Sequence, residues 1–225
     1  MPTITPPLHY LKRPSQPSES TQGTAKTTKG IVLIHGYGSN EQDLFSFAPH
    51  LPKELIVFSL QAPIPMQPYG NAWYDIYIDD NGIKSSNTQQ ALYAKNKIIE
   101  FIRYVKTTYH LDEVSLLGFS QGAILSYAVA LSYPHEVKNI LALSGYLNRD
   151  LLEDLQTLQE NNYKELSIYA SHGVEDQVIP IDLACQAQET LNALQIENQW
   201  HEYSAGHGIA PENFQSLLQW LSEKI

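Results

Sequence analysis

Short apolar runs alternate with longer segments in which apolar residues recur every three to four positions. The first pattern is typical of strands buried on both faces, and the second of amphipathic helices. The predicted strands are 8–12, 30–35, 55–60, 114–119, 139–144, 166–171 and 198–204. The predicted helices are 40–48, 88–109, 121–133, 148–160, 181–195 and 211–224. This alternation predicts an α/β fold with a mostly parallel central sheet and helices on both faces.

The N-terminal region departs from this pattern. Residues 14–29 read PSQPSESTQGTAKTTK and are nearly all small and polar. We expect a mobile loop there, because such a segment has too little apolar surface to bury. Residues 1–29 are therefore predicted to form a short strand plus a Ser/Thr/Pro-rich loop, and residues 30–225 the core of the same single domain. The total of 225 residues suits one domain.

Composition narrows the function classes. The net charge of −10 disfavours binding to nucleic acids and to anionic membrane surfaces. No apolar run approaches the roughly 18 residues of a membrane span, and the N-terminus shows no apolar signal segment. The single cysteine, Cys185, permits no internal disulfide and lies in an amphipathic run without the features of a nucleophile. These observations predict a cytoplasmic protein with no nucleic-acid partner and no membrane span; nothing in the pattern specifies an oligomeric state.

A possible nucleophile stands where a predicted strand meets a predicted helix. The stretch LLGFSQG places Ser120 between Gly118 and Gly122, directly after the strand 114–119. This is the G-x-S-x-G pattern of a sharp strand-to-helix turn that exposes a serine hydroxyl. Glycines are needed at such a turn because the strand and helix backbones pass close together. Ser120 is therefore the predicted nucleophile.

A serine hydroxyl needs a base, and the base needs an orienting acid. In chains with this kind of serine turn, the order is serine, acid, histidine. Among the histidines that follow Ser120, His207 lies in a glycine-flanked loop between the last strand and the last helix, and is the predicted base. His201 lies inside a predicted strand, and His172 is expected to be a loop histidine that bonds to the backbone.

The acid is predicted from the loop HGVEDQVIP, which follows the strand 166–171. Asp176 is the predicted acid because it lies nearer the following helix, and Glu175 is expected to be a solvated loop charge. Asp182 is expected in the first turn of that helix, where a carboxylate is favourable.

Two backbone N–H groups are expected to stabilise an oxyanion. One belongs to Gln121, at the predicted helix N-terminus after the serine. The other is that of Tyr37, in the loop IHGYGSN, where Gly36 and Gly38 allow the backbone to turn. His35 is expected to shape this loop rather than to titrate in the mechanism.

Several segments together resemble the carboxylesterase/phospholipase group of α/β-hydrolases, which includes acyl-protein thioesterases. They are IHGYGSNEQDL, WYD, GFSQGA, LALSGYL, HGVEDQVIP and GHGIAPE, in family order. The resemblance implies an α/β-hydrolase fold, hydrolysis of carboxylic esters or thioesters without a cofactor, and the same roles for Ser120, Asp176, His207, Tyr37 and Gln121. The sequence departs from the family pattern at Ala123, where the second glycine after SQG is usual.

The segment APIPMQPYGNAWYDIYIDDNG is expected to be a long loop beside the active site, with Trp73 and Tyr74 lining an acyl or alcohol pocket. Residues 145–165 have room for one helix but not for a cap domain. An uncovered site favours short-to-medium acyl chains.

The predicted substrate is a small-molecule ester or thioester, with a lysophospholipid or an acylated protein within that range. No metal-binding motif is present, so no metal is expected. The alternative is an idle protein of the same fold that binds a ligand or another protein, since fold alone does not prove activity.

Overall fold

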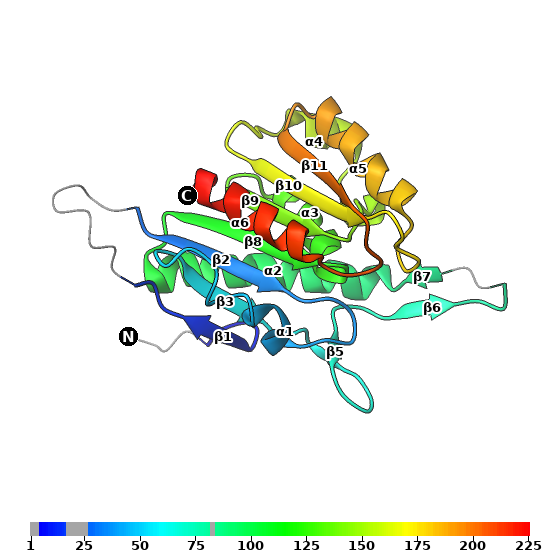
Figure 1. Cartoon of the computed structure of the whole chain (residues 1–225), viewed down its shortest axis with the longest axis horizontal. Coiled ribbons are helices and arrows are strands. Elements are labelled where there is room, and N and C mark those ends of the chain that lie inside the picture. Colours follow the sequence, from blue (N-terminus) through cyan, green and yellow to red (C-terminus); the bar gives the residue numbers. More distant parts are fainter. Residues whose placement is uncertain (1–4, 17–26, 82–83) are drawn as a thin grey trace.

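The structure, a computed structural model, describes residues 5–16, 27–81 and 84–225. Most of the loop predicted over 14–29 lies outside these ranges. A central sheet has the strand order β1-β3-β2-β8-β9-β10-β11 (Figure 1). Its strands are β1 (Tyr10–Arg13), β2 (Lys29–Ile34), β3 (Ile56–Leu60), β8 (Glu113–Phe119), β9 (Asn139–Leu143), β10 (Ser167–Gly173) and β11 (Glu197–Tyr203). Strand β1 is antiparallel to β3 and every other pairing is parallel, which confirms the predicted sheet.

Helices cover both faces of the sheet, as predicted. They are α1 (Glu41–Phe45), α2 (Thr88–Tyr109), α3 (Gln121–Ser132), α4 (Leu155–Glu160), α5 (Ile181–Ala193) and α6 (Pro211–Lys224). Side chains of α2, α3, α4 and α5 pack into one apolar core, and those of α1 and α6 into the other. Figure 1 shows α6 crossing the near face of the sheet, with α2 and α3 behind it.

Strand β2 shows why the apolar runs are continuous. Val32 and Ile34 point into the core on one face, and Ile31 and Leu33 into the core on the other. All four side chains are fully buried. Because successive side chains of a strand point to opposite faces, a strand covered on both sides needs apolar residues at every position.

The helix predicted over 148–160 is wrong in its extent. The segment forms a 3-10 turn, η1 (Arg149–Leu151), and then the short helix α4. The side chain of Asn148 caps η1 and that of Asp154 caps α4, and Leu152 between them is extended. Each cap begins a new element, which interrupts the helix.

Residues 145–165 contain no cap domain. Two small hairpins lie in the long segment between β3 and α2. One pairs β4 (Ile64–Pro65) with β5 (Asn71–Ala72), and the other pairs β6 (Ile76–Ile78) with β7 (Lys84–Ser86). The β6–β7 hairpin projects from the body of the molecule (Figure 1). None of the helices in the described ranges is long and apolar enough to cross a membrane.

Candidate active site

The turn at Ser120 is strained in the way the glycine pattern predicts. Ser120 has φ 54° and ψ −117°, a backbone conformation that residues other than glycine rarely adopt. A Cβ atom at Gly118 would lie 2.3 Å from the carbonyl oxygen of Gly122. A Cβ atom at Gly122 would lie 1.9 Å from the carbonyl oxygen of Ile34. The two glycines therefore let β8, α3 and the end of β2 pass close together, which holds Ser120 at the tip of the turn.

Three side chains from separate loops meet at this turn. The Oγ atom of Ser120 lies 3.0 Å from Nε2 of His207, and Nδ1 of His207 lies 2.7 Å from Oδ2 of Asp176. The ring of Phe119 packs against the imidazole of His207, with centroids 5.0 Å apart. Serine, histidine and carboxylate therefore form one continuous chain of hydrogen bonds.

The carboxylate of Asp176 is buried and accepts several hydrogen bonds. Its Oδ1 atom accepts the backbone N–H groups of Val178 and Ile179, at 2.8 and 2.9 Å. Burial by itself would raise the pKa of Asp176, but the hydrogen bonds from His207, Ile179 and Val178 outweigh it and lower the pKa below its ordinary value. Asp176 is therefore ionised at neutral pH and accepts a hydrogen bond from the Nδ1–H group of His207.

A second histidine contacts the same carboxylate. His172 is fully buried, and its Nε2 atom lies 2.8 Å from the carbonyl oxygen of Ile179 and 3.3 Å from Oδ2 of Asp176. The bond to a carbonyl requires a proton on Nε2, so the Nε2–H is engaged by Ile179 and the carboxylate of Asp176 is a further, longer contact of the same nitrogen. The sequence predicts the bond to the backbone but not the contact with Asp176. The H-G-x-x-D spacing, which puts His172 four residues before Asp176, was the available signal.

The loop after β2 presents the backbone N–H of Tyr37. His35 is fully buried, and its Nε2 atom accepts the N–H of Ala62 at 3.1 Å. The proton is therefore on Nδ1, which donates to the carbonyl oxygen of Gly36 at 2.7 Å. That carbonyl belongs to the same planar peptide as the Tyr37 N–H, so the bond orients both groups. Burial lowers the pKa of His35, in keeping with a neutral, structural imidazole.

Neither the N–H of Tyr37 nor that of Gln121 has a hydrogen-bond acceptor among the described residues. Both residues border the same cavity as Ser120. Two unpaired backbone donors beside the hydroxyl of Ser120 are the arrangement that an oxyanion needs.

Trp73 connects the loop that carries the Tyr37 N–H to the start of α3, which carries the Gln121 N–H; these two segments are called the donor loops below. Its indole N–H donates to the carbonyl of His35 at 2.9 Å, and its backbone N–H donates to the side chain of Gln121 at 3.1 Å. The same side chain donates to the carbonyl of Tyr74 at 2.8 Å. Trp73 is fully buried and is not among the residues that line the cavity. The prediction that Trp73 lines the pocket is therefore wrong, because its side chain points into the core, whereas Tyr74 does border the cavity.

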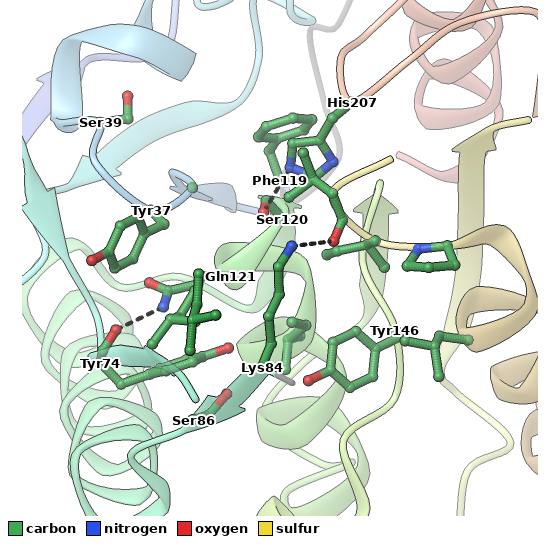
Figure 2. A pocket seen from close by; sticks show the side chains of 18 of the residues that line it. Tyr37, Ser39, Tyr74, Lys84, Ser86, Phe119, Ser120, Gln121, Tyr146 and His207 are labelled. Atoms are coloured by element: carbon green, nitrogen blue, oxygen red, sulfur yellow. Dashed lines mark hydrogen bonds between the residues drawn. The ribbon is translucent and has the colours of Figure 1, made fainter. Parts of the chain in front are cut away.

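A cavity of about 640 Å³ opens beside Ser120 (Figure 2). Its wall is mostly apolar and includes Ile124, Tyr146 and Leu183. One face of the β6–β7 hairpin forms a further part of this wall. The sequence predicts that this segment lies beside the site, but as a loop rather than as two strands. The alternation of Ile76 and Ile78 before DDNG was a hairpin signal.

Other residues weighed from the sequence lie apart from this group. The side chain of Glu175 is exposed, and Asp182 lies in the first turn of α5 as expected. His201, in β11, stacks on Tyr169 of β10, with ring centroids 4.8 Å apart. Cys185 is half-buried on α5, and burial raises the pKa of its thiol. The described ranges contain no group of three His, Cys, Asp or Glu residues that could hold a metal ion.

Comparison with known proteins gives consistent matches. A family model described as phospholipase/carboxylesterase matches residues 18–225. Acyl-protein thioesterase 1 of Kluyveromyces lactis is 27% identical over 228 residues, covering 89% of this chain and 94% of that protein. Esterase YpfH of Escherichia coli is 29% identical over 168 residues, covering 72% of this chain and 67% of that protein. The crystal structure of a Bacillus cereus carboxylesterase has a TM-score of 0.80 at 16% identity, covering 97% of this chain and 95% of that one, and shows the same fold.

Proposed function

The chain belongs to the phospholipase/carboxylesterase family, whose fold is that of the α/β-hydrolases, and from that premise we propose that it is a serine hydrolase of carboxylic esters or thioesters. The observation that carries the proposal is the hydrogen-bonded chain from Ser120 through His207 to Asp176. This series of hydrogen bonds connects a nucleophile, a base and an orienting acid.

The protonation states follow from the contacts. Ionised Asp176 accepts a hydrogen bond from the Nδ1–H of His207, and this tautomer leaves Nε2 unprotonated and facing the hydroxyl of Ser120. As Ser120 Oγ attacks the acyl carbon, Nε2 takes its proton and then passes it to the leaving oxygen or sulfur. A water molecule then attacks the acyl carbon while Nε2 takes its proton; the bond from the acyl carbon to Oγ breaks, Nε2 returns the proton to Oγ, and the carboxylic acid is released. Each step uses only these side chains and water, so the proposed reaction needs no cofactor.

The negative charge that forms on the substrate oxygen is assigned to the two unpaired backbone donors. The N–H of Gln121 lies at the positive end of α3, and the N–H of Tyr37 is oriented through the bond between His35 and Gly36. Donors fixed before the reaction stabilise the oxyanion without reorganising, and each contributes about 2.7–4 kcal/mol to the transition state.

The apolar cavity next to Ser120 is the proposed place for the acyl or alcohol part of the substrate. Its volume of about 640 Å³ suits short-to-medium chains. The names of the relatives, an acyl-protein thioesterase and an esterase, support a range from small-molecule esters to acylated proteins, with lysophospholipids within it. Tyr74 is the proposed substrate-binding aromatic of this wall.

The test compares purified wild-type protein with Ser120→Ala on 4-nitrophenyl esters and on acyl thioesters read out by thiol release. We expect turnover by the wild type and a loss of at least about 100-fold in the variant, because nucleophile and base act as a unit. Ser222→Ala, which removes an exposed hydroxyl on α6, is the matched control. A wild type inactive on the whole panel would favour the idle binding protein instead.

A further inference from the structure

The β6–β7 hairpin lines the active-site cavity with one of its faces. In the antiparallel register Ile76 lies opposite Ser86, and Ile78 opposite Lys84. Directly opposed residues share a face of a sheet, as do residues two apart on one strand. All four of these residues border the cavity. Tyr77, on the other face, is exposed and is not part of the cavity wall. The hairpin wall therefore presents an apolar row from β6 and a polar row from β7.

Lys84 brings a positive charge into this apolar wall. Figure 2 shows its side chain running up from the hairpin through the cavity in the direction of Ser120. Its ammonium donates one hydrogen bond, to the carbonyl oxygen of Val178 at 3.2 Å. No carboxylate of the described ranges lies within salt-bridge distance of it. An ammonium has three donors, and Lys84 is exposed at the edge of the cavity, so its remaining donors are open to solvent and to a ligand in the cavity.

The other charged groups of the cavity wall do not neutralise Lys84. Asp43 borders the cavity on the side of the Tyr37 loop and accepts a hydrogen bond from Ser39 at 2.6 Å. His207 is already engaged with Ser120 and Asp176. Exposed apolar side chains, among them Ile76, Ile78 and Leu183, make up much of the remaining wall, so the ammonium lies beside apolar surface and stays accessible to a ligand.

The positive charge of Lys84 contrasts with the negative net charge of the whole molecule. With a net charge of −10, the protein as a whole repels anions. A neutral ester would gain no ionic attraction from an ammonium placed in its binding cavity. An ester with an apolar arm and an anionic end would gain an apolar contact and a charge-assisted hydrogen bond together.

We propose that Lys84 makes the cavity select esters or thioesters in which the group occupying it carries an anion, either a carboxylate or a phosphate. This inference rests on the proposed hydrolase function and adds a specificity-determining residue and a substrate class to it. Lys84 recognises the anion, while the row Ile76–Ile78 contacts the apolar arm between the anion and the ester.

The test uses 4-nitrophenyl monoesters of adipic, pimelic and suberic acid, with neutral 4-nitrophenyl alkanoates of equal carbon number as references. Shorter dicarboxylates are avoided because their free carboxylate attacks the ester itself. A second series with a terminal phosphonate distinguishes phosphate from carboxylate recognition. The quantity measured is the ratio of kcat/KM for the anionic ester to that for its neutral partner, at low and at high salt.

We expect Lys84→Met to lower this ratio about tenfold, the effect of one hydrogen bond to a charged group. Lys84→Arg should retain most of the ratio, and high salt should reduce it in the wild type. Lys164→Met, which removes an exposed lysine in the loop before β10, should leave it unchanged.

Two outcomes would overturn the inference while leaving the hydrolase function intact. One is an unchanged ratio in Lys84→Met. The other is an equal loss on anionic and neutral esters, which would mean that Lys84 only holds the hairpin against Val178. A wild type that hydrolyses neither series would instead refute the proposed function, and the inference with it.

Discussion

At the residue scale, the proposed reaction depends on the protonation state of Asp176 and His207. The hydrogen bonds from His207, Val178 and Ile179 lower the pKa of Asp176 against the effect of its burial. A carboxyl group with a lowered pKa contributes stability that is complete above its unfolded pKa, near 4, and is lost as the pH falls through its folded pKa. Asp176 therefore stays ionised at neutral pH, as an acceptor for the imidazole.

Asp176→Asn tests this role at the same size and shape. An amide can donate to Nδ1 of His207 and so favour the tautomer with its proton on Nε2, which cannot accept the proton of Ser120. We expect kcat to fall about 10⁴-fold while the fold is retained. The control is Glu175→Gln on the adjacent exposed residue, which should change kcat little. If Glu175→Gln were the damaging change, the acid would be Glu175.

Trp73→Phe tests whether Trp73 joins the two donor loops. The substitution leaves the carbonyl of His35 buried without its indole donor, and it also opens space in the core. The matched control is Trp200→Phe, whose indole N–H donates to Glu202 at an exposed position. We expect Trp73→Phe to lower the free energy of unfolding by about 1–3 kcal/mol more than the control does. Equal losses in urea unfolding would show that the bond to His35 contributes nothing.

At the element scale, the turn between β8 and α3 determines where the nucleophile lies. Ser120 keeps a positive φ because the strand before it and the helix after it are both packed into the core. Gly122 permits this packing, since its Cα faces the carbonyl of Ile34 at the end of β2. The strain at Ser120 is therefore maintained by the elements around it, as is common at catalytic turns.

Gly122→Ala should disrupt this packing. Its new Cβ would lie 1.9 Å from a backbone oxygen, so β2 and α3 would have to separate. We expect a loss of about 3 kcal/mol or more in the free energy of unfolding. Gly208→Ala is the control, because nothing lies within 4 Å of its added Cβ, and it should cost less than about 0.5 kcal/mol. A Gly122→Ala protein as stable as the control would contradict the close approach.

Elements with strong local signals could be predicted closely from the sequence. Helices α2 and α6 have the predicted bounds, because each combines an apolar stripe with a clear start, an Asn87 cap or Pro211. The helix over 148–160 was mispredicted because Asn148 and Asp154 both act as caps within one apolar pattern. Periodicity reports which residues are buried, but it does not report where a backbone leaves the helix.

Some site residues could be predicted from the sequence and others could not. Motif and chain order bring Ser120, Asp176 and His207 into consideration, because each follows a strand whose end faces the same edge of the sheet. Trp73 could not be placed from sequence, since adjacent residues in extended chain point to opposite sides and only one of the pair Trp73 and Tyr74 borders the cavity. Lys84 was missed because its relevance depends on the fold of the hairpin wall.

At the scale of the whole molecule, parallel strand order assembles the site. The Tyr37 loop follows β2 and the Ser120 turn follows β8, its neighbour in the sheet. The Asp176 loop follows β10 and the His207 loop follows β11, which are also neighbours. All four loops therefore leave the same edge of the sheet. The described ranges place no cap domain over this edge, and the β6–β7 hairpin forms a side wall of the cavity.

An uncovered site predicts a particular dependence on the substrate. Each buried methylene contributes about 0.8 kcal/mol, but only while the cavity can still cover it. We expect kcat/KM for 4-nitrophenyl esters to rise with chain length and then to level off or decline for long chains. The rate should show no jump when a micelle-forming ester passes its critical micelle concentration. A sharp activation at that concentration would contradict an uncovered site.

The central claim is that Ser120 is an activated nucleophile, and labelling with a fluorophosphonate tests it most directly. The reagent forms a covalent bond only with a serine that a base has activated. An activated Ser120 predicts one equivalent of label by intact mass, located by peptide mapping at Ser120, with none on Ser120→Ala and strongly slowed labelling of His207→Ala. A wild-type protein that stays unlabelled, or a Ser120→Ala protein that is labelled at the wild-type rate, would contradict it.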